Sequence, residues 1–400
     1  MKILFVHDRF GAFGGAESNA LLTATELKRR GHDLAVLHGP VTGRGEAPWR
    51  TTFSQFYPLA PNGNRLRVQT AIMDFQPDVI YVHKMAELEV LDQLGQCRTP
   101  VIRMVHDHDL YCMRSYKYFF WNRKICNRAA SPFCLFGCGA FLARNRGRGW
   151  PFRWVSYFEK KKEIRLNQKF ERMIVATAYM REELLRNGFA HDRIRVLPPA
   201  TEFSEGRIDS TFSNRNLIVF AGQIIRGKGV DVLIESLARV EATFECMIIG
   251  EGNHKSYCQA LARKLGLEDR VHFTGFLPQP EIRAYYKECS LVVLSSIWPE
   301  PFGAVGLEGM RHGLPVVAFD AGGIREWLLD GQNGFLVPWR DRSRFAERVE
   351  QLLTDKILAK QMGETGRKYV TQQYDVASYI STLENLLGEV VPESQSKAHA

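Results

Sequence analysis

The chain has 400 residues, a length that favours two domains of ordinary size over a single α/β core. Its composition, 45% hydrophobic and 24% charged residues, excludes a disordered or fibrous protein, and no stretch approaches the roughly 20 apolar residues of a membrane-spanning helix. The net charge of +9 belongs to one half: residues 1–198 hold 31 basic and 18 acidic side chains (+13), and the remainder holds 22 and 26 (−4). Such an excess in the first half favours an anionic partner or surface.

The first half alternates short apolar runs with helical patterns. A glycine-rich turn at 11–15 follows the first run, and helically spaced leucines come after it. This alternation is typical of parallel βαβ units in a doubly wound sheet. The first run meets an acid at Asp8 and lacks a cleavage site, so we predict a buried strand instead of a signal peptide and expect a cytoplasmic protein. Strands are predicted over residues 3–7, 34–37, 79–82, 101–105, 173–176 and 194–197.

The second half repeats the alternation after an interruption. Pro198 and Pro199 block both helix and sheet continuation, which marks a linker there. The predicted fold class is therefore α/β, with two Rossmann-like doubly wound parallel-sheet domains, and the polar tail 391–400 is expected to be disordered. In this half, strands are predicted over 217–220, 244–249, 271–273, 291–294 and 315–319, and helices over 230–240, 345–353 and 377–387.

The sharpest motif is the segment 300–308, Glu-Pro-Phe-Gly-Ala-Val-Gly-Leu-Glu, which follows the predicted strand 291–294 and opens a helix near Phe302. Ligands bind at the carboxyl ends of strands in a doubly wound sheet. Glu300 precedes the helix within reach of sugar hydroxyls, and Glu308 lies further along it, where it can accept hydrogen bonds from ribose hydroxyls. Unpaired N–H groups and the helix dipole suit a diphosphate, and the groups in question are those of Phe302, Gly303, Ala304 and Val305.

This pattern, Glu300-x7-Glu308, resembles the acidic signature of the retaining glycosyltransferases of GT-B architecture, specifically glycosyltransferase family 4. Further segments match the family in the same order, and the resemblance covers roughly residues 1–390. It implies two domains facing across a cleft, with the acceptor bound by residues 1–198 and the nucleotide sugar by 199–373. A helix over 374–390 would cross back onto the first domain, and neither a metal nor a cofactor is implied. The further matching segments are 14–17, 222–229, 250–252, 273–277 and 322–326.

The basic loop of the family is present with one departure. Lys228 keeps the position of the family's lysine, whereas Gln223 stands where the family usually carries an arginine. Without a metal, a leaving diphosphate needs cationic side chains for its stabilisation. Arg226 lies in the same loop and is the candidate that supplies the missing charge beside Lys228.

Three other positions acquire a role from the resemblance. His106 ends a predicted strand and matches the family's histidine near the donor sugar, where a neutral imidazole hydrogen-bonds a sugar hydroxyl. Gly15 lets the backbone approach the acceptor or the donor phosphate closely. Phe276 and Leu277 match the loop that holds the nucleotide base, with core packing as the alternative for such side chains.

The resemblance implies retaining transfer of a sugar from a UDP-sugar, GDP-sugar or similar donor to a hydroxyl of a saccharide or lipid-linked acceptor, in the synthesis of a cell-surface polysaccharide or lipopolysaccharide. Two alternatives stay open: an inactive GT-B scaffold or binding protein, which the departure at Gln223 favours, and a nucleotide-sugar epimerase. A nicotinamide dehydrogenase is disfavoured, because Gly11, Gly14 and Gly15 do not form Gly-x-Gly-x-x-Gly and the second strand runs into His38 instead of an acid.

Two features of the first half remain outside these motifs. Residues 141–169 are dense in basic side chains interleaved with aromatic ones, which suits contact with an anionic membrane surface. The alternative is a solvated helix with its aromatic side chains in the core, and no nucleic-acid-binding module is recognised. Four cysteines also cluster, and they are either reduced thiols or ligands of a structural metal: Cys112, Cys126, Cys134 and Cys138.

Overall fold

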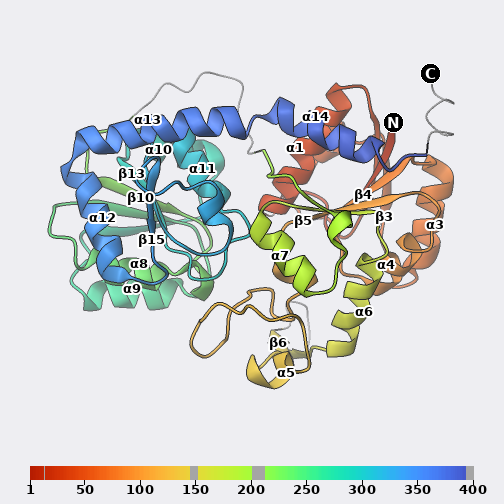
Figure 1. Cartoon of the computed structure of the whole chain (residues 1–400), viewed down its shortest axis with the longest axis horizontal. Helices are drawn as coiled ribbons and strands as arrows, with labels where there is room; N and C mark the ends of the chain where they lie inside the picture. Colours follow the sequence, from red (N-terminus) through yellow and green to blue (C-terminus); the bar gives the residue numbers. More distant parts are fainter. Residues whose placement is uncertain (13, 145–151, 201–211, 393–400) are drawn as a thin grey trace. The chain divides into compact units, whose positions relative to one another are not determined.

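The protein forms two compact units in a computed structural model that describes residues 1–12, 14–144, 152–200 and 212–392 (Figure 1). Unit 1 comprises Met1–Ser115, Asn127–Glu202 and Val376–Ala400, and unit 2 comprises Tyr116–Cys126 and Phe203–Asp375. The borders predicted from the sequence, 198/199 and 373/374, lie a few residues from these. The sequence gives no sign that Tyr116–Cys126 packs with the second half. Most of the predicted disordered tail, 393–400, lies outside the described residues.

Unit 1 is built on a sheet of seven parallel strands in the order β3-β2-β1-β4-β5-β8-β9. Its inner strands are buried along nearly their whole length, which explains their continuous apolar sequences. The strand order reverses between β1 and β4, so the loops after these strands border the crevice where such sheets bind ligands. The strands are β1 (Lys2–His7), β2 (Asp33–His38), β3 (Gln55–Pro58), β4 (Val79–Lys84), β5 (Val101–Val105), β8 (Arg172–Val175) and β9 (Ile194–Val196).

Helices cover this sheet, and the last helix of the chain is one of them. Helix α14 (Val376–Gly388) packs beside α1 (Gly15–Arg29), with Tyr379, Ile380 and Leu383 in the unit 1 core (Figure 1). The Glu384 carboxylate pairs with the Arg30 guanidinium at 2.5 Å and with the His32 ring at 2.7 Å. The other elements of unit 1 are α2 (Glu46–Thr52), α3 (Asn64–Phe75), α4 (Leu88–Leu94), η1 (His108–Leu110), α5 (Phe133–Gly137), β6 (Leu142–Arg144), β7 (Phe152–Trp154), α6 (Tyr157–Asn167), α7 (Ala178–Arg186) and η2 (His191–Arg193).

Unit 2 has a sheet of six parallel strands in the order β12-β11-β10-β13-β14-β15, and its order reverses between β10 and β13. Helices α8, α9 and α12 lie on one face of this sheet and α10, α11 and α13 on the other (Figure 1). The strands are β10 (Leu217–Ala221), β11 (Glu245–Ile249), β12 (Val271–Gly275), β13 (Leu291–Leu294), β14 (Val316–Phe319) and β15 (Gly334–Val337). The helices are η3 (Arg226–Lys228), α8 (Val230–Leu237), α9 (Lys255–Lys264), α10 (Gln279–Glu288), α11 (Ala304–Arg311), η4 (Gly323–Glu326), α12 (Arg342–Thr354) and α13 (Lys356–Gln373).

The prediction of two doubly wound parallel sheets is confirmed, and each predicted strand is present with ends shifted by a residue or two. Strands β3 and β15 were not predicted; β3 is largely exposed and ends at Pro58, and β15 is a four-residue strand that begins at Gly334. The helix expected near Phe302 begins at Ala304, because Gly303 takes a left-handed conformation with φ +84° and caps it. Among the helices described, none is long and apolar enough to cross a membrane.

Candidate functional site

The carboxyl edge of the unit 2 sheet gathers most of the predicted site residues. The loop 222–229 follows β10 and the loop 295–303 follows β13, the two strands on either side of the order reversal. The N–H groups of Ile297 and Trp298 both donate to the Gly227 carbonyl, at 2.9 and 3.0 Å, and the Ser295 hydroxyl donates to the Lys228 carbonyl at 2.9 Å. These bonds join the two loops, so that their side chains lie together at the carboxyl edge of the sheet.

Lys228 and Glu300 form an ion pair at this edge of the sheet. The Lys228 ammonium donates to Glu300 Oε1 at 2.6 Å and lies 5.2 Å from the centre of the Trp298 ring. The Glu300 side chain is almost fully buried, at 4% exposed, and the Ser296 hydroxyl donates to the same oxygen. Burial acts to raise the pKa of Glu300, but Lys228 and the hydrogen bonds outweigh it and hold that pKa below its ordinary value. The site therefore contains an ionised carboxylate beside a cation.

The backbone of Glu300 is fixed by the loop after β14. Its N–H donates to the Ala321 carbonyl at 3.1 Å, and its carbonyl accepts from the Gly323 N–H at 2.8 Å. Gly322 between them has φ +72°, and a Cβ there would lie 2.4 Å from the Glu300 carbonyl oxygen. A side chain at position 322 is thus excluded by both conformation and space, which explains the first of the two glycines in this motif.

The start of α11 lies directly after Glu300 in the chain. Ala304 and Val305 occupy the first turn of the helix, so their N–H groups and the helix dipole face the edge of the sheet. Phe302 and Gly303, which were predicted to contribute helix N–H groups as well, precede the helix instead. Glu308 lies in the second turn and is half-buried.

The remaining predicted residues of unit 2 occupy the same edge. Gln223 is exposed in the loop 222–229, and the guanidinium of Arg226 lies 5.3 Å from the centre of the Phe120 ring. Phe276, 70% exposed, and the half-buried Leu277 follow β12, two strands away from β10. The exposure of Phe276 disagrees with core packing as the role of this side chain.

The unit 1 sheet presents a second cluster at its carboxyl edge, around His106. This residue follows β5, and its Nε2 lies 3.0 Å from Nδ1 of His83 in β4, with the two rings stacked 5.2 Å apart. Burial, and then the nearby His7, Lys84 and Arg103, lower the pKa of His106 to about 3. Its imidazole is therefore neutral at neutral pH and can donate one hydrogen bond and accept another.

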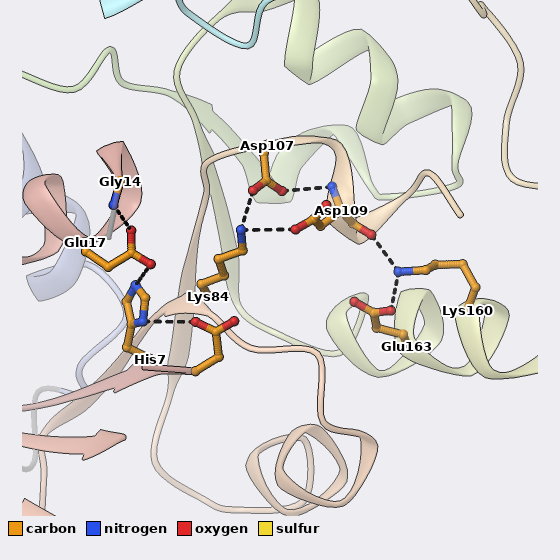
Figure 2. Close-up of polar contacts among 9 residues, drawn as sticks. His7, Gly14, Glu17, Lys84, Asp107, Asp109, Lys160 and Glu163 are labelled. Carbon is orange, nitrogen blue, oxygen red and sulfur yellow. Dashed lines mark hydrogen bonds and ion pairs between the residues drawn. The ribbon is translucent and has the colours of Figure 1, made fainter. Parts of the chain in front are cut away.

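Ion pairs lie next to this histidine pair, and Figure 2 shows those of Lys84 and Lys160. Lys84 lies between Asp107 and Asp109, at 2.7 and 3.1 Å, and Lys160 binds both Glu163, at 2.5 Å, and the Asp109 carbonyl, at 2.6 Å. Sequence reasoning missed Lys84, although its position at the end of a strand is the same signal that singles out His106. A cavity of about 60 Å³ opens among these groups, and its charged and imidazole lining comprises Asp8, His83, Lys84, Arg103, His106, Asp107, Asp109 and Glu163.

One set of side chains in unit 1 has the composition of a metal site, namely His7, Asp8 and Glu17. His7 Nδ1 lies 3.2 Å from Asp8 and its Nε2 lies 3.9 Å from Glu17, which also accepts from the Gly14 N–H at 2.9 Å (Figure 2). Because the ring nitrogens face different carboxylates, the set forms a polar network that anchors the glycine loop. Among the described residues no other such set exists, so the four clustered cysteines do not form one. Gly15 opens α1, and a Cβ there would meet no atom within 4 Å, so packing does not require this glycine.

The basic and aromatic stretch 141–169 contributes Lys160 and Glu163 to the unit 1 edge and also carries exposed rings. Trp154 and Phe158 are 80% and 81% exposed, and Phe136 of the preceding helix α5 is 82% exposed. For Trp154 and Phe158, these values contradict the alternative in which the aromatic side chains of this stretch are turned into the core. Residues 145–151 of the stretch are outside the described part of the chain.

Comparison with known proteins agrees with these observations. Residues 13–204 match the family model for Glycosyltransferase Family 4, and residues 204–369 match that for Glycosyl transferases group 1. The lipopolysaccharide core biosynthesis glycosyltransferase LpsE of Rhizobium meliloti is 31% identical over 158 residues, 40% of this chain and 45% of the relative. A GDP-mannose-dependent phosphatidylinositol monomannoside mannosyltransferase of Mycobacterium tuberculosis is 29% identical over 201 residues, 48% and 52% of the two chains. The chain thus spans about half the length of the curated relatives it matches.

Solved structures show the same fold. The Anabaena protein HepE, in complex with UDP-glucose, aligns with a TM-score of 0.73 and 21% identity over 98% of this chain and all of its own. Staphylococcus aureus TarM, in complex with UDP and an α-GlcNAc-glycerol, aligns with a TM-score of 0.70 and 13% identity over 96% and 99% of the two chains. The two family models together span residues 13–369, and with this shared GT-B fold they show that the chain belongs to the group 1, family 4 glycosyltransferases.

Proposed function

We propose that the protein is a retaining glycosyltransferase that moves a sugar from a nucleoside-diphosphate sugar to a hydroxyl of a saccharide or lipid-linked acceptor. The observation that carries the proposal is the Lys228–Glu300 ion pair at the order reversal of the unit 2 sheet, next to the start of α11. A cation and helix N–H groups suit a diphosphate, while a fixed carboxylate suits sugar hydroxyls.

In this proposal the acceptor oxygen bonds to the anomeric carbon on the face from which the diphosphate departs. The anomeric C–O bond to the diphosphate breaks, and the acceptor's proton passes to a phosphate oxygen of the leaving group. Lys228, Arg226 and the N–H groups at the start of α11 stabilise the departing charge without a metal. Glu300 holds hydroxyls of the sugar and Glu308 those of the ribose.

The remaining site residues have supporting roles. We assign the nucleotide base to the loop of Phe276 and Leu277, and a phosphate or acceptor contact to the exposed backbone at Gly15. His106, held neutral, hydrogen-bonds a sugar hydroxyl. The relative of Mycobacterium tuberculosis is named as GDP-mannose-dependent and HepE was solved with UDP-glucose, so both nucleotides are candidates for the donor.

We further propose that the enzyme works at the inner face of the cytoplasmic membrane, in the synthesis of a cell-surface polysaccharide or lipopolysaccharide. The exposed rings of Trp154 and Phe158 support this, since they lie beside the exposed cations of α6, which are Lys161, Lys162 and Arg165. Exposed aromatic side chains with neighbouring cations fit the interface of an anionic bilayer. The name of the Rhizobium meliloti relative places that protein in lipopolysaccharide core synthesis.

A ligand panel tests the proposed function. Thermal unfolding is measured with UDP, GDP, ADP, their common sugar conjugates and NAD, each far above its dissociation constant. A ligand at about 100 times that constant adds roughly 2.7 kcal/mol to the free energy of unfolding. One nucleoside diphosphate should stabilise the protein, and Glu308→Ala should abolish this effect. Stabilisation by NAD alone would reject the proposal, while donor binding without transfer to any acceptor would favour an inactive scaffold.

A further inference from the structure

A short hairpin of the first half of the chain packs within unit 2. This hairpin arm, Tyr116–Cys126, lies between β5 and α5, two elements of unit 1. Tyr118 pairs with Ile125 in antiparallel register, and the Phe119 N–H donates to the Lys124 carbonyl at 2.9 Å. Arg123 stands at the turn, with φ +59°, and its N–H donates to the Phe119 carbonyl at 2.9 Å.

The arm is attached to unit 2 through Arg123. Its guanidinium donates to both carboxylate oxygens of Asp231, at 3.1 and 2.7 Å, and to the Arg226 carbonyl at 3.3 Å. Asp231 is 4% exposed and lies in the first turn of α8, directly after the loop 222–229. Such two-point pairs between a guanidinium and a carboxylate are strong and fix orientation. Arg123 therefore binds Arg226 within the loop 222–229 and Asp231 just beyond it.

Aromatic rings of the arm cover the same loop. A Cβ on Gly227 would lie 3.1 Å from a ring atom of Tyr118 and 3.2 Å from Cβ of Trp298, so this glycine is enclosed between the arm and the loop after β13. The Phe120 ring lies 5.3 Å from the guanidinium of Arg226. The segment 226–231, which contains Lys228, is thus held by the arm at both ends, with Gly227 against the Tyr118 ring at the first of them.

We propose that the hairpin arm is part of the donor site and that Arg123 is a positioning residue, which fixes the loop 222–229 so that Lys228 meets the diphosphate of the donor beside Glu300. The role is geometric, because the charge of Arg123 is neutralised by Asp231 and does not replace the arginine missing at Gln223. This inference rests on the proposed function and adds a residue that lies outside the motifs of the family resemblance.

Calorimetric titration of variants tests the inference. Dissociation constants are measured for whichever of UDP, GDP or ADP binds the wild type, and for the corresponding nucleoside, which lacks phosphates. Misplacement of a group by about 1 Å can cost about 100-fold in reaction rate, and we expect misplacement of Lys228 to weaken diphosphate binding as well. Arg123→Ala should therefore weaken the diphosphate at least about 10-fold and leave the nucleoside within about twofold. Arg123→Lys keeps the charge and loses the two-point geometry. Its dissociation constant for the diphosphate should therefore lie between those of the wild type and Arg123→Ala.

The control is Arg215→Ala, which removes ion pairs with Glu245 and Glu288 in the same unit, far along the chain from the arm. It should bind both ligands as the wild type does. Equal losses for diphosphate and nucleoside in Arg123→Ala, or no loss, would overturn the inference, and Arg123→Lys decides in the same way if the alanine variant does not fold. Failure of the wild type to bind any nucleoside diphosphate would instead reject the proposed function itself.

Discussion

At the scale of single residues, the Lys228–Glu300 pair is the feature with the clearest energetic consequence. Removal of one partner leaves a buried charge uncompensated, which typically costs about 3–5 kcal/mol. We expect Lys228→Ala to lower the free energy of unfolding in urea by about this amount, because Glu300 stays buried without its cation. The double variant Lys228→Ala/Glu300→Gln should recover part of the loss, since no charge remains. Equal stability of the two variants would show that the pair is not coupled.

The lowered pKa of His106 predicts that the free energy of unfolding depends on pH. Its pKa is lowered from an ordinary value of 6.5 to about 3, so between these values the unfolded chain binds more protons than the folded protein. The stability from the neutral imidazole is fully present above pH 6.5 and is lost as the pH falls toward 3. The free energy of unfolding should therefore fall less between pH 7 and pH 5 in His106→Gln than in the wild type. The exposed His191 is the control, and its glutamine variant should keep the wild-type slope.

At the scale of elements, two glycine variants separate two effects. One is the contact between Gly322 and the Glu300 backbone, and the other is the cost of placing an alanine in a left-handed conformation. Gly322 and Gly331 have φ +72° and +74°, but a Cβ on Gly331 would meet no atom within 4 Å. Gly331→Ala should lower the free energy of unfolding in urea by about 1 kcal/mol and leave the proposed sugar transfer unchanged. Gly322→Ala should cost more and reduce transfer, because the loop must move away from Glu300. Similar effects of the two alanines on stability and transfer would count against this role of the loop after β14.

The elements also show how far sequence alone reaches. Strands such as β13 and β14 are predictable because burial on both faces leaves an unbroken apolar run. The edge strand β3 has no such run, and Arg103 sits within a strand without a motif to flag it, whereas the strand-end position of Lys84 was an available signal. The contact of Arg123 with Asp231 spans 108 positions of the chain, so no local pattern reports it. Motifs therefore singled out residues that lie together at the unit 2 edge, whereas ion pairs made by tertiary contacts needed the structure.

At the scale of the whole molecule, the two halves share an architecture but differ in charge, with +13 in residues 1–198 and −4 in the rest. Both sheets present loops at an order reversal, but among the described residues the Lys228–Glu300 pair and the start of α11, which suit a diphosphate, belong to unit 2, while the exposed aromatic side chains of α5, β7 and α6 belong to unit 1. This division is consistent with the proposal that unit 2 binds the donor and that unit 1 meets the acceptor and the membrane surface. The charge and the exposed rings then have one common explanation, which vesicle binding can test.

We expect the wild type to sediment with vesicles that contain phosphatidylglycerol and not with pure phosphatidylcholine, because basic side chains are attracted to anionic headgroups. Binding should weaken at about 0.5 M salt, where the Debye length falls well below 8 Å. Trp154→Ser/Phe158→Ser removes two rings that are about four-fifths exposed and should reduce binding without loss of stability. Ile357→Ser, an equally exposed apolar position on α13 in unit 2, is the matched control and should bind as the wild type does. If the double variant also binds fully, Trp154 and Phe158 do not contribute to vesicle binding, and the attraction of basic side chains to the anionic headgroups accounts for it.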